Sequence, residues 1–277
     1  MAAGRDTSDF IGAAPDAELI VVKLKKARQF GLSLFAVPEE QENAYSSIAV
    51  MIGVEYIIKK ARELDRPVVI CLGVGTNSGR HDGFSIFEEY LSGVANMTGV
   101  CLCVAAGNET QARHHFHGKV SARGEKKNME VMVGGSRTDF FISLWSSVSD
   151  KVSVSLLSPS GEFIDKVPPK TGSIQMTDLL LERASVRVAY YFPLEGSGGQ
   201  LTTVRVLGAT PGIWTITVNG DLILDGAFDA CGFTLGVIVR FRRNSSDTYF
   251  AFLLIFFPIS DKVSLEYSPA SIAILSE

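Results

Sequence analysis

Apolar residues in the first part of the chain form continuous runs instead of alternating with polar residues. Such runs cover 19–24, 67–72 and 100–106, and turn residues bound each of them. Continuous apolarity is typical of strands that are buried on both faces of a sheet. Between the runs, residues 43–65 and 84–97 place apolar side chains at helical spacing. The alternation of strands and helices predicts a parallel α/β sheet.

The pattern changes after about residue 120, where apolar and polar residues alternate. Val152, Val154 and Leu156 are separated by serines, and residues 214–219 alternate in the same way. A period of two residues is typical of antiparallel strands with one face toward solvent. Turn-forming residues interrupt this stretch at 158–161, 195–199 and 209–212. The pattern predicts an all-β domain, either a sandwich or a jelly roll.

The last part of the chain contains a run of nine apolar residues, Tyr249–Phe257. A helix needs about 20 residues to cross a bilayer, so no membrane span is expected here. The run predicts a buried strand, which would be prone to aggregate if its partner strands were missing.

Composition and charge exclude some classes of function. Apolar residues make up 46% of the 277 residues, which is enough for packed cores. The net charge of -4 arises from 26 basic and 30 acidic residues that are mixed along the chain. Because no basic stripe results, nucleic-acid binding is not expected. No cationic segment followed by an apolar stretch opens the chain, so we expect no secretory signal in it.

The cysteines indicate a reducing compartment. Three of the four lie inside apolar runs, and none forms a CxxC pair; the four are Cys71, Cys101, Cys103 and Cys231. Structural zinc sites usually carry such pairs. We therefore expect buried, reduced thiols in a cytosol-like environment.

The segment most informative about chemistry is Val104–Glu109, with the sequence VAAGNE. It follows the third predicted strand, and the carboxyl ends of parallel strands are where ligands bind. The segment resembles the A-A-G-N-E motif of subtilisin-like serine peptidases, in which the Asn amide donates to the oxyanion of the tetrahedral intermediate. The resemblance assigns this role to Asn108. Taken alone, Asn108 is better explained as a loop Asn that caps the turn after Gly107, and it is the matching stretches upstream that favour the oxyanion role.

Two further stretches are similar to the same family. Residues 11–19 resemble a G-x-A-P-x-A-x-L pattern that leads into a core strand, and residues 68–73 resemble a strand that pairs with substrate backbone. The resemblance covers about residues 1–118. It implies a peptide-binding groove, because extended backbone pairs with a peptide while small residues leave room for its side chains. The implied substrate-binding residues are Leu72, Gly73, Val74, Ala105, Ala106 and Gly107.

The catalytic triad of the family is not found. The chain has no G-T-S, H-G-T or D-T/S-G motif, which carry the family's nucleophile, base and acidic residue. Nucleophilic catalysis by serine needs an oriented base beside the hydroxyl group. We therefore expect no peptide hydrolysis by this chain alone.

The histidines suggest a metal site only weakly. His114, His115 and His117 are crowded, but apart from Glu109 no acidic residue or cysteine lies at ligand spacing beside them. His81 lies apart in a glycine-rich loop. We expect a solvated loop cluster, no metal, no calcium loop and no cofactor.

The β-rich stretch refines the resemblance. A jelly roll inserted at this place is similar to the clostridial Csp-type germination proteases and related subtilases of gut Clostridia; residues 108–115 and 210–214 carry this likeness. The resemblance implies an α/β fold: a partial subtilisin-like doubly wound parallel sheet over 1–119, an inserted all-β domain over 120–226 and an atypical tail over 227–277. It also implies a cytoplasmic or spore-associated location.

Three functions follow, in order of preference. The first is a serine-type endopeptidase of the subtilisin family, present as an internal fragment that acts on a peptide or protein substrate. The second is a non-catalytic pseudopeptidase that binds a protein through its groove and jelly roll. The third is a sugar- or protein-binding sandwich on an unrelated α/β domain, ranked last because the surroundings of Trp145 and Trp214 favour core packing over a carbohydrate platform.

Overall fold

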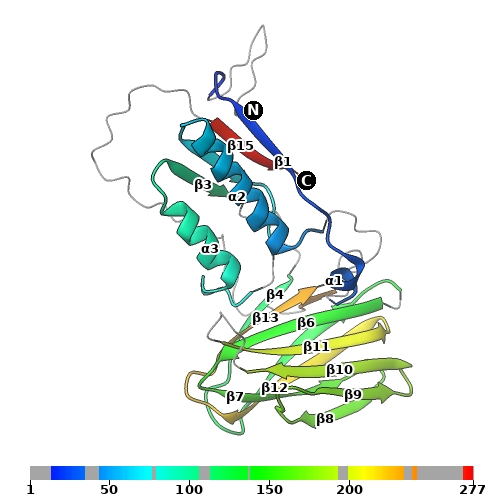
Figure 1. Cartoon of the computed structure of the whole chain (residues 1–277). Coiled ribbons are helices and arrows are strands. Elements are labelled where there is room, and N and C mark those ends of the chain that lie inside the picture. Colours follow the sequence, from blue (N-terminus) through cyan, green and yellow to red (C-terminus); the bar gives the residue numbers. More distant parts are fainter. Residues whose placement is uncertain are drawn as a thin grey trace.

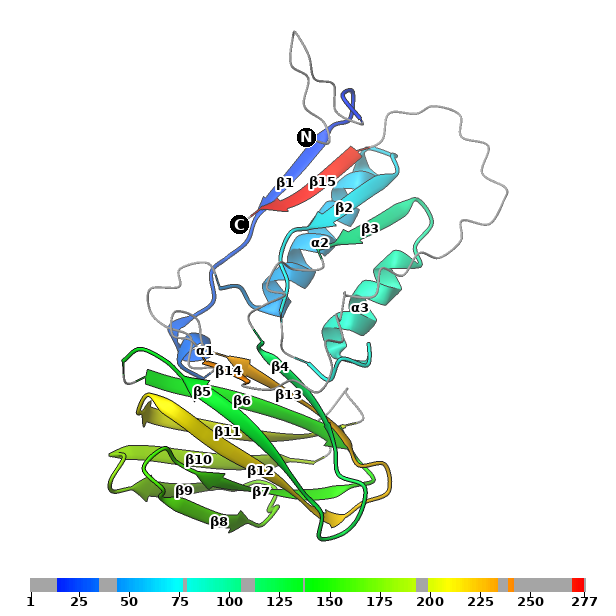
Figure 2. The ribbon, with the colours of Figure 1, turned by 180° about the vertical axis from the view of Figure 1, so that it is seen from behind.

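The described chain consists of a small parallel sheet with helices and a larger sandwich of two antiparallel sheets (Figure 1). The computed structural model describes residues 14–34, 44–76, 79–105, 113–136, 138–192, 199–233, 239–241 and 271–276. In both views the parallel sheet lies beside one end of the sandwich (Figures 1 and 2).

The parallel sheet has four strands. Their order is β1 (Leu19–Lys23), β15 (Ser271–Ser276), β2 (Val68–Leu72) and β3 (Val100–Val104), and every neighbouring pair is parallel. The prediction that the three apolar runs form strands is confirmed by β1, β2 and β3. Strand β15 was not predicted, and it fills the position between β1 and β2.

The helices confirm the two segments with helical spacing. Helix α2 spans Ser47–Glu63 and helix α3 spans Ile86–Ala95, while the short α1 spans Gln29–Leu34. Helix α2 begins at Ser46, whose side chain accepts a hydrogen bond from the Ala49 amide. Helix α3 begins with a capping box between Ser85 and Glu88.

Helices α2 and α3 cover one face of the parallel sheet. Both lie in front of the sheet in Figure 1 and behind it in Figure 2. On that side Val54, Ile57 and Ile58 of α2 form a buried core with Ile70 and Leu72 of β2. Burial of this apolar stripe fixes the helices on the sheet.

The other face of the parallel sheet carries exposed apolar residues. Leu19 and Val21 of β1 are 54% and 60% exposed. A doubly wound sheet has helices on both faces, and in the described chain only one face is covered. Most strands belong to the antiparallel sheets, so the chain is mainly β-structure and the prediction of an α/β doubly wound fold is wrong. Apolar residues on both faces of the strands suggested that both faces of the sheet are covered. The sequence of a strand does not show whether other segments of the chain supply the second covering layer.

The cysteines follow the same division. Cys231 is buried, whereas Cys101 and Cys103 of β3 are exposed and Cys71 of β2 is half-buried; all four are free thiols. The prediction of buried thiols is confirmed for Cys231 and wrong for Cys101 and Cys103. Alternate residues of β3 point to opposite faces of the sheet, and Cys101 and Cys103 point to the face that none of the described helices covers.

The sandwich accounts for most of the strands. One sheet has the order β4 (His115–Lys119), β13 (Ala227–Phe233), β6 (Thr138–Ser147), β11 (Gly199–Ala209), β10 (Ala184–Tyr191) and β9 (Ile174–Leu179). The other has the order β14 (Val239–Phe241), β5 (Lys126–Val133), β12 (Gly212–Leu222), β7 (Lys151–Leu157) and β8 (Phe163–Val167). All pairings within both sheets are antiparallel. Strands β4, β13 and β14 extend the sandwich beyond the expected range of 120–226.

The sandwich core lies between its two sheets. Phe140 of β6 and Trp214 of β12 are fully buried and meet edge to face, with ring centroids 5.8 Å apart. The Trp214 indole donates a hydrogen bond to the Thr210 carbonyl oxygen at 3.0 Å. Trp145 is also buried, at 8% exposure. Core packing is thereby confirmed for Trp214, whereas Trp145 lies on the other face of β6 from the core residues Phe140, Ile142 and Leu144.

The tail is described only in part. The apolar run 249–257 lies outside the described residues. Among the helices that the structure describes, none has the length and apolarity to cross a membrane.

Candidate functional site

The predicted peptide-binding strand and the strand that leads to Asn108 are neighbours. Strands β2 and β3 pair in parallel, with Leu72 opposite Val104. Just past the strand ends, the Ala105 amide donates to the Leu72 carbonyl oxygen at 2.9 Å. The two segments singled out from the sequence therefore leave the same edge of the sheet side by side.

The predicted substrate-binding residues differ in accessibility. Leu72 is buried and its carbonyl pairs with β3, whereas Gly73 is exposed and Val74 is half-buried. Because β15 and β3 flank β2, added backbone pairing is open only beyond Leu72. Ala105 is exposed at the end of β3. Ala106, Gly107 and Asn108 lie outside the described residues.

The segment that follows β2 contacts the sandwich. The Arg80 side chain lies over Gly199 of β11, where an added Cβ would be 2.9 Å from Arg80 Cδ. Arg80 also pairs with Asp82 at 2.9 Å. This segment places His81 against strand β13.

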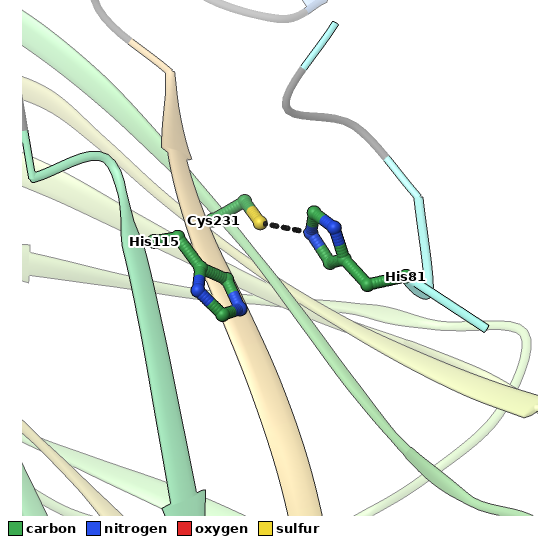
Figure 3. Close-up of side chains that lie close together, drawn as sticks. All are labelled: His81, His115 and Cys231. Carbon is green, nitrogen blue, oxygen red and sulfur yellow. Dashed lines mark hydrogen bonds between the residues drawn. The ribbon is translucent and has the colours of Figure 1, made fainter. Parts of the chain in front are cut away.

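His81 meets a cluster of polar side chains on β4 and β13 (Figure 3). Its Nε2 lies 2.9 Å from Cys231 Sγ. The Asp229 Oδ1 atom lies 3.0 Å from His115 Nε2 and 2.9 Å from His117 Nδ1. The antiparallel pairing of β4 with β13 explains the proximity, because His115 is opposite Cys231 and His117 is opposite Asp229.

The surroundings shift three pKa values in this cluster. Burial lowers the pKa of His81, and the neighbouring His115 lowers it further. Burial disfavours the Asp229 carboxylate, but hydrogen bonds from His115 and His117 outweigh this effect and lower the pKa of Asp229. Burial raises the pKa of Cys231. Near neutral pH the cluster therefore contains a neutral His81, a protonated thiol and an ionised carboxylate.

Sequence reasoning missed this cluster. His115 and His117 lie on strand β4 and not in the loop that was expected. Their acidic and thiol partners, Asp229 and Cys231, come from a strand more than 100 residues later, so no spacing rule connects them. One signal was available in the sequence. His115 and His117 are two residues apart, as are Asp229 and Cys231, so on two paired strands each pair would point to one face of the sheet.

Comparison with known proteins relates the chain to one described enzyme. No family model and no curated protein matches it. The solved structure of the CspB protease of Clostridium perfringens matches with a TM-score of 0.65 and 24% sequence identity. The chain therefore shares the fold of the matched part of this protease. The match covers 76% of this chain and 44% of the CspB structure, so the chain spans less than half the length of CspB.

Proposed function

We propose that this chain is part of a subtilisin-like serine peptidase and supplies the substrate-binding edge and the oxyanion donor. The supporting observation is the adjacency of Leu72 and Ala105 at the ends of paired strands, in a fold shared with CspB. A protein or peptide substrate is the proposed ligand, and the cytoplasm or the spore is the proposed location.

In the proposed chemistry, different residues along this edge bind the substrate backbone, stabilise the transition state and accommodate a substrate side chain. A substrate in extended form pairs with the backbone of Gly73 and Val74, beyond the last ladder bond of β2. The Asn108 side chain donates to the oxygen that becomes negative in the transition state. The small residues Ala105, Ala106 and Gly107 leave space for a substrate side chain.

A catalytic dyad made by Cys231 and His81 is a poor alternative. A cysteine nucleophile needs an accessible thiolate. Cys231 is 0% exposed, and burial raises its pKa. In the described chain the neighbouring His115 and His117 both contact Asp229. We therefore expect the chain to be inactive by itself.

Labelling with a fluorophosphonate probe tests the predicted inactivity. The purified chain is expected to show no more labelling than heat-denatured chain, because its sequence has no G-T-S or H-G-T motif to supply a nucleophile and its base. Specific labelling of the native chain would contradict the proposal.

Peptide binding tests the proposed groove. Unstructured peptides added to isotope-labelled protein are expected to shift the backbone amide signals of residues 72–74. Gly73→Pro is expected to abolish the shift because proline lacks the N–H group, while Gly73→Ala retains that group and retains binding. Binding that Gly73→Pro leaves unchanged would refute a role for this edge.

The second candidate is a pseudopeptidase that binds a protein without cleaving it. The exposed apolar face of the parallel sheet, with Leu19 and Val21, favours it. In that case shifts on adding a partner would include β1 and the sandwich strands. Shifts confined to residues 72–74 and 105 would favour the peptidase.

A further inference from the structure

We propose that His81, His115 and Cys231 form a binding site for one Zn²⁺ ion at the contact between the parallel-sheet part and the sandwich. The three residues come from the segment before α3, from β4 and from β13. One ligand atom from each lies within 4.8 Å of the other two. This proposal is independent of the proposed peptidase function.

The donor set favours zinc over hard cations. Imidazole nitrogen and thiolate sulfur suit Zn²⁺, whereas Mg²⁺ and Ca²⁺ prefer oxygen ligands. Zinc binds nitrogen at about 2.0–2.1 Å and sulfur at about 2.3 Å. In a tetrahedral site the ligand atoms are therefore roughly 3.3–3.7 Å apart. The 2.9 Å contact between His81 and Cys231 is slightly shorter than this, and no two of the three ligand atoms are more than 4.8 Å apart.

The imidazole rings of His81 and His115 pack against each other, which is the arrangement expected of two ligands of one metal ion. The rings of His81 and His115 have centroids 4.7 Å apart and are tilted by 56° (Figure 3). Each neutral imidazole ring carries one nitrogen lone pair that can coordinate a metal ion. A divalent ion shared by the two rings uses these lone pairs.

Asp229 orients one of the proposed ligands, His115, by a hydrogen bond. Its Oδ1 accepts from His115 Nε2, which leaves Nδ1 as the nitrogen that carries the lone pair. A carboxylate that orients a metal-binding histidine in this way is common around zinc. The Asp229 carboxylate and a Cys231 thiolate together balance the two positive charges of the ion.

The backbone of His81 also indicates a functional constraint. Its φ is 61°, in the left-handed region that non-glycine residues seldom adopt. Such strain persists where surrounding contacts hold the residue in place, and it is frequent at ligand sites. A metal bond from His81 to the sandwich strands would supply such a contact.

Metal binding requires the loss of one proton. The Cys231 thiol transfers its proton to solvent and the sulfur then binds Zn²⁺ as a thiolate, while His81 and His115 bind as neutral rings. Three protein ligands leave a fourth position for water. The bound ion would fasten residues 79–85 to strands β4 and β13.

The experiment uses the full chain, prepared without metal and titrated with Co²⁺ and then Zn²⁺. The expected result is one Co²⁺ per chain, with a thiolate-to-cobalt charge-transfer band that Zn²⁺ removes by displacement. Cys231→Ser and His81→Asn are each expected to lose the band; Asn tolerates the left-handed backbone at position 81. Asp229→Asn is expected to weaken zinc affinity about 10- to 100-fold in competition with a chromophoric chelator.

Cys101→Ser/Cys103→Ser is the matched control, because it removes two exposed thiols of β3 and leaves the cluster intact. The band is expected to persist in this control. Absence of the band in the wild-type chain would overturn the proposal, and so would its persistence in both Cys231→Ser and His81→Asn. Near-ultraviolet circular dichroism of the metal-free variants identifies any variant that fails to fold, in which case the other of the two decides the outcome.

Discussion

The α-carbon of Gly226 faces the backbone of Val120 so closely that an added Cβ would lie 1.9 Å from the Val120 carbonyl oxygen. Gly226 also has a φ of 80°, which favours glycine. Gly226→Ala is therefore expected to destabilise the fold by at least about 3 kcal/mol, measured by urea unfolding. Gly161→Ala is the control: Gly161 has a φ of 92° but open space around its Cβ position, so it is expected to cost only about 1–2 kcal/mol. Equal losses in the two variants would show that the close contact is unimportant.

Asp150 holds the turn that precedes β13. Its buried carboxylate accepts from the amides of Leu224, Asp225 and Gly226 at 2.7, 2.9 and 2.7 Å. Asp150→Ala leaves these donors without their acceptor and is expected to cost about 3 kcal/mol in unfolding free energy. The exposed Asp165 accepts a hydrogen bond from the amide of its neighbour Lys166, and Asp165→Ala is expected to change the unfolding free energy by no more than about 0.5 kcal/mol. A similar loss in both would contradict this role of Asp150.

Glu182 makes the sandwich sensitive to acid. Burial disfavours its charged form, but hydrogen bonds from Thr210 and Ser160 outweigh this effect and lower the pKa of Glu182 below its ordinary 4.5. A carboxylate with a lowered folded pKa stabilises the fold above its unfolded pKa, and this contribution is lost as the pH falls through the folded pKa. Glu182→Gln is expected to flatten the fall in unfolding free energy between pH 7 and pH 3, measured by urea titration at each pH. An unchanged slope would place the acid sensitivity elsewhere.

Strand β15 is the connection between β1 and the rest of the parallel sheet. In the described chain β1 pairs along its length only with β15, which in turn pairs with β2. Ala273→Pro removes a backbone N–H in the middle of β15 and is expected to raise amide hydrogen exchange in β1 by at least tenfold. Both tryptophans, Trp145 and Trp214, lie in the sandwich, so their fluorescence is expected to stay native. Unchanged exchange in β1 would show that β15 does not stabilise it.

Local patterns predicted the elements of the parallel-sheet part well. The runs that became β1, β2 and β3 and the periodic segments that became α2 and α3 were each recognised, because propensity and spacing act over a few residues. The period of two likewise predicted the antiparallel sandwich. The overall class was wrong, since the share of antiparallel strands and the bare face of the parallel sheet depend on contacts between distant segments.

The candidate sites show the same limit. Adjacency of Leu72 and Ala105 followed from two strands in one parallel sheet, which sequence order suggests. The meeting of His81 with Cys231 depends on how the segment before α3 lies against β13, and no short-range pattern records that contact. The role of Asn108 stays a prediction, because this residue lies outside the described part.

The position of β15 has a consequence for the timing of folding. Leu19 pairs with Ile272, so the parallel sheet joins strands that are separated by the whole sandwich. Contacts between residues so far apart in sequence form slowly, because the entropy cost of closing a large loop comes before the favourable energy of the contacts. As the chain leaves the ribosome, the sandwich strands up to β13 can assemble while β1 still has no neighbour to pair with. Among the parts that the structure describes, the parallel sheet is therefore the one that is completed last during synthesis.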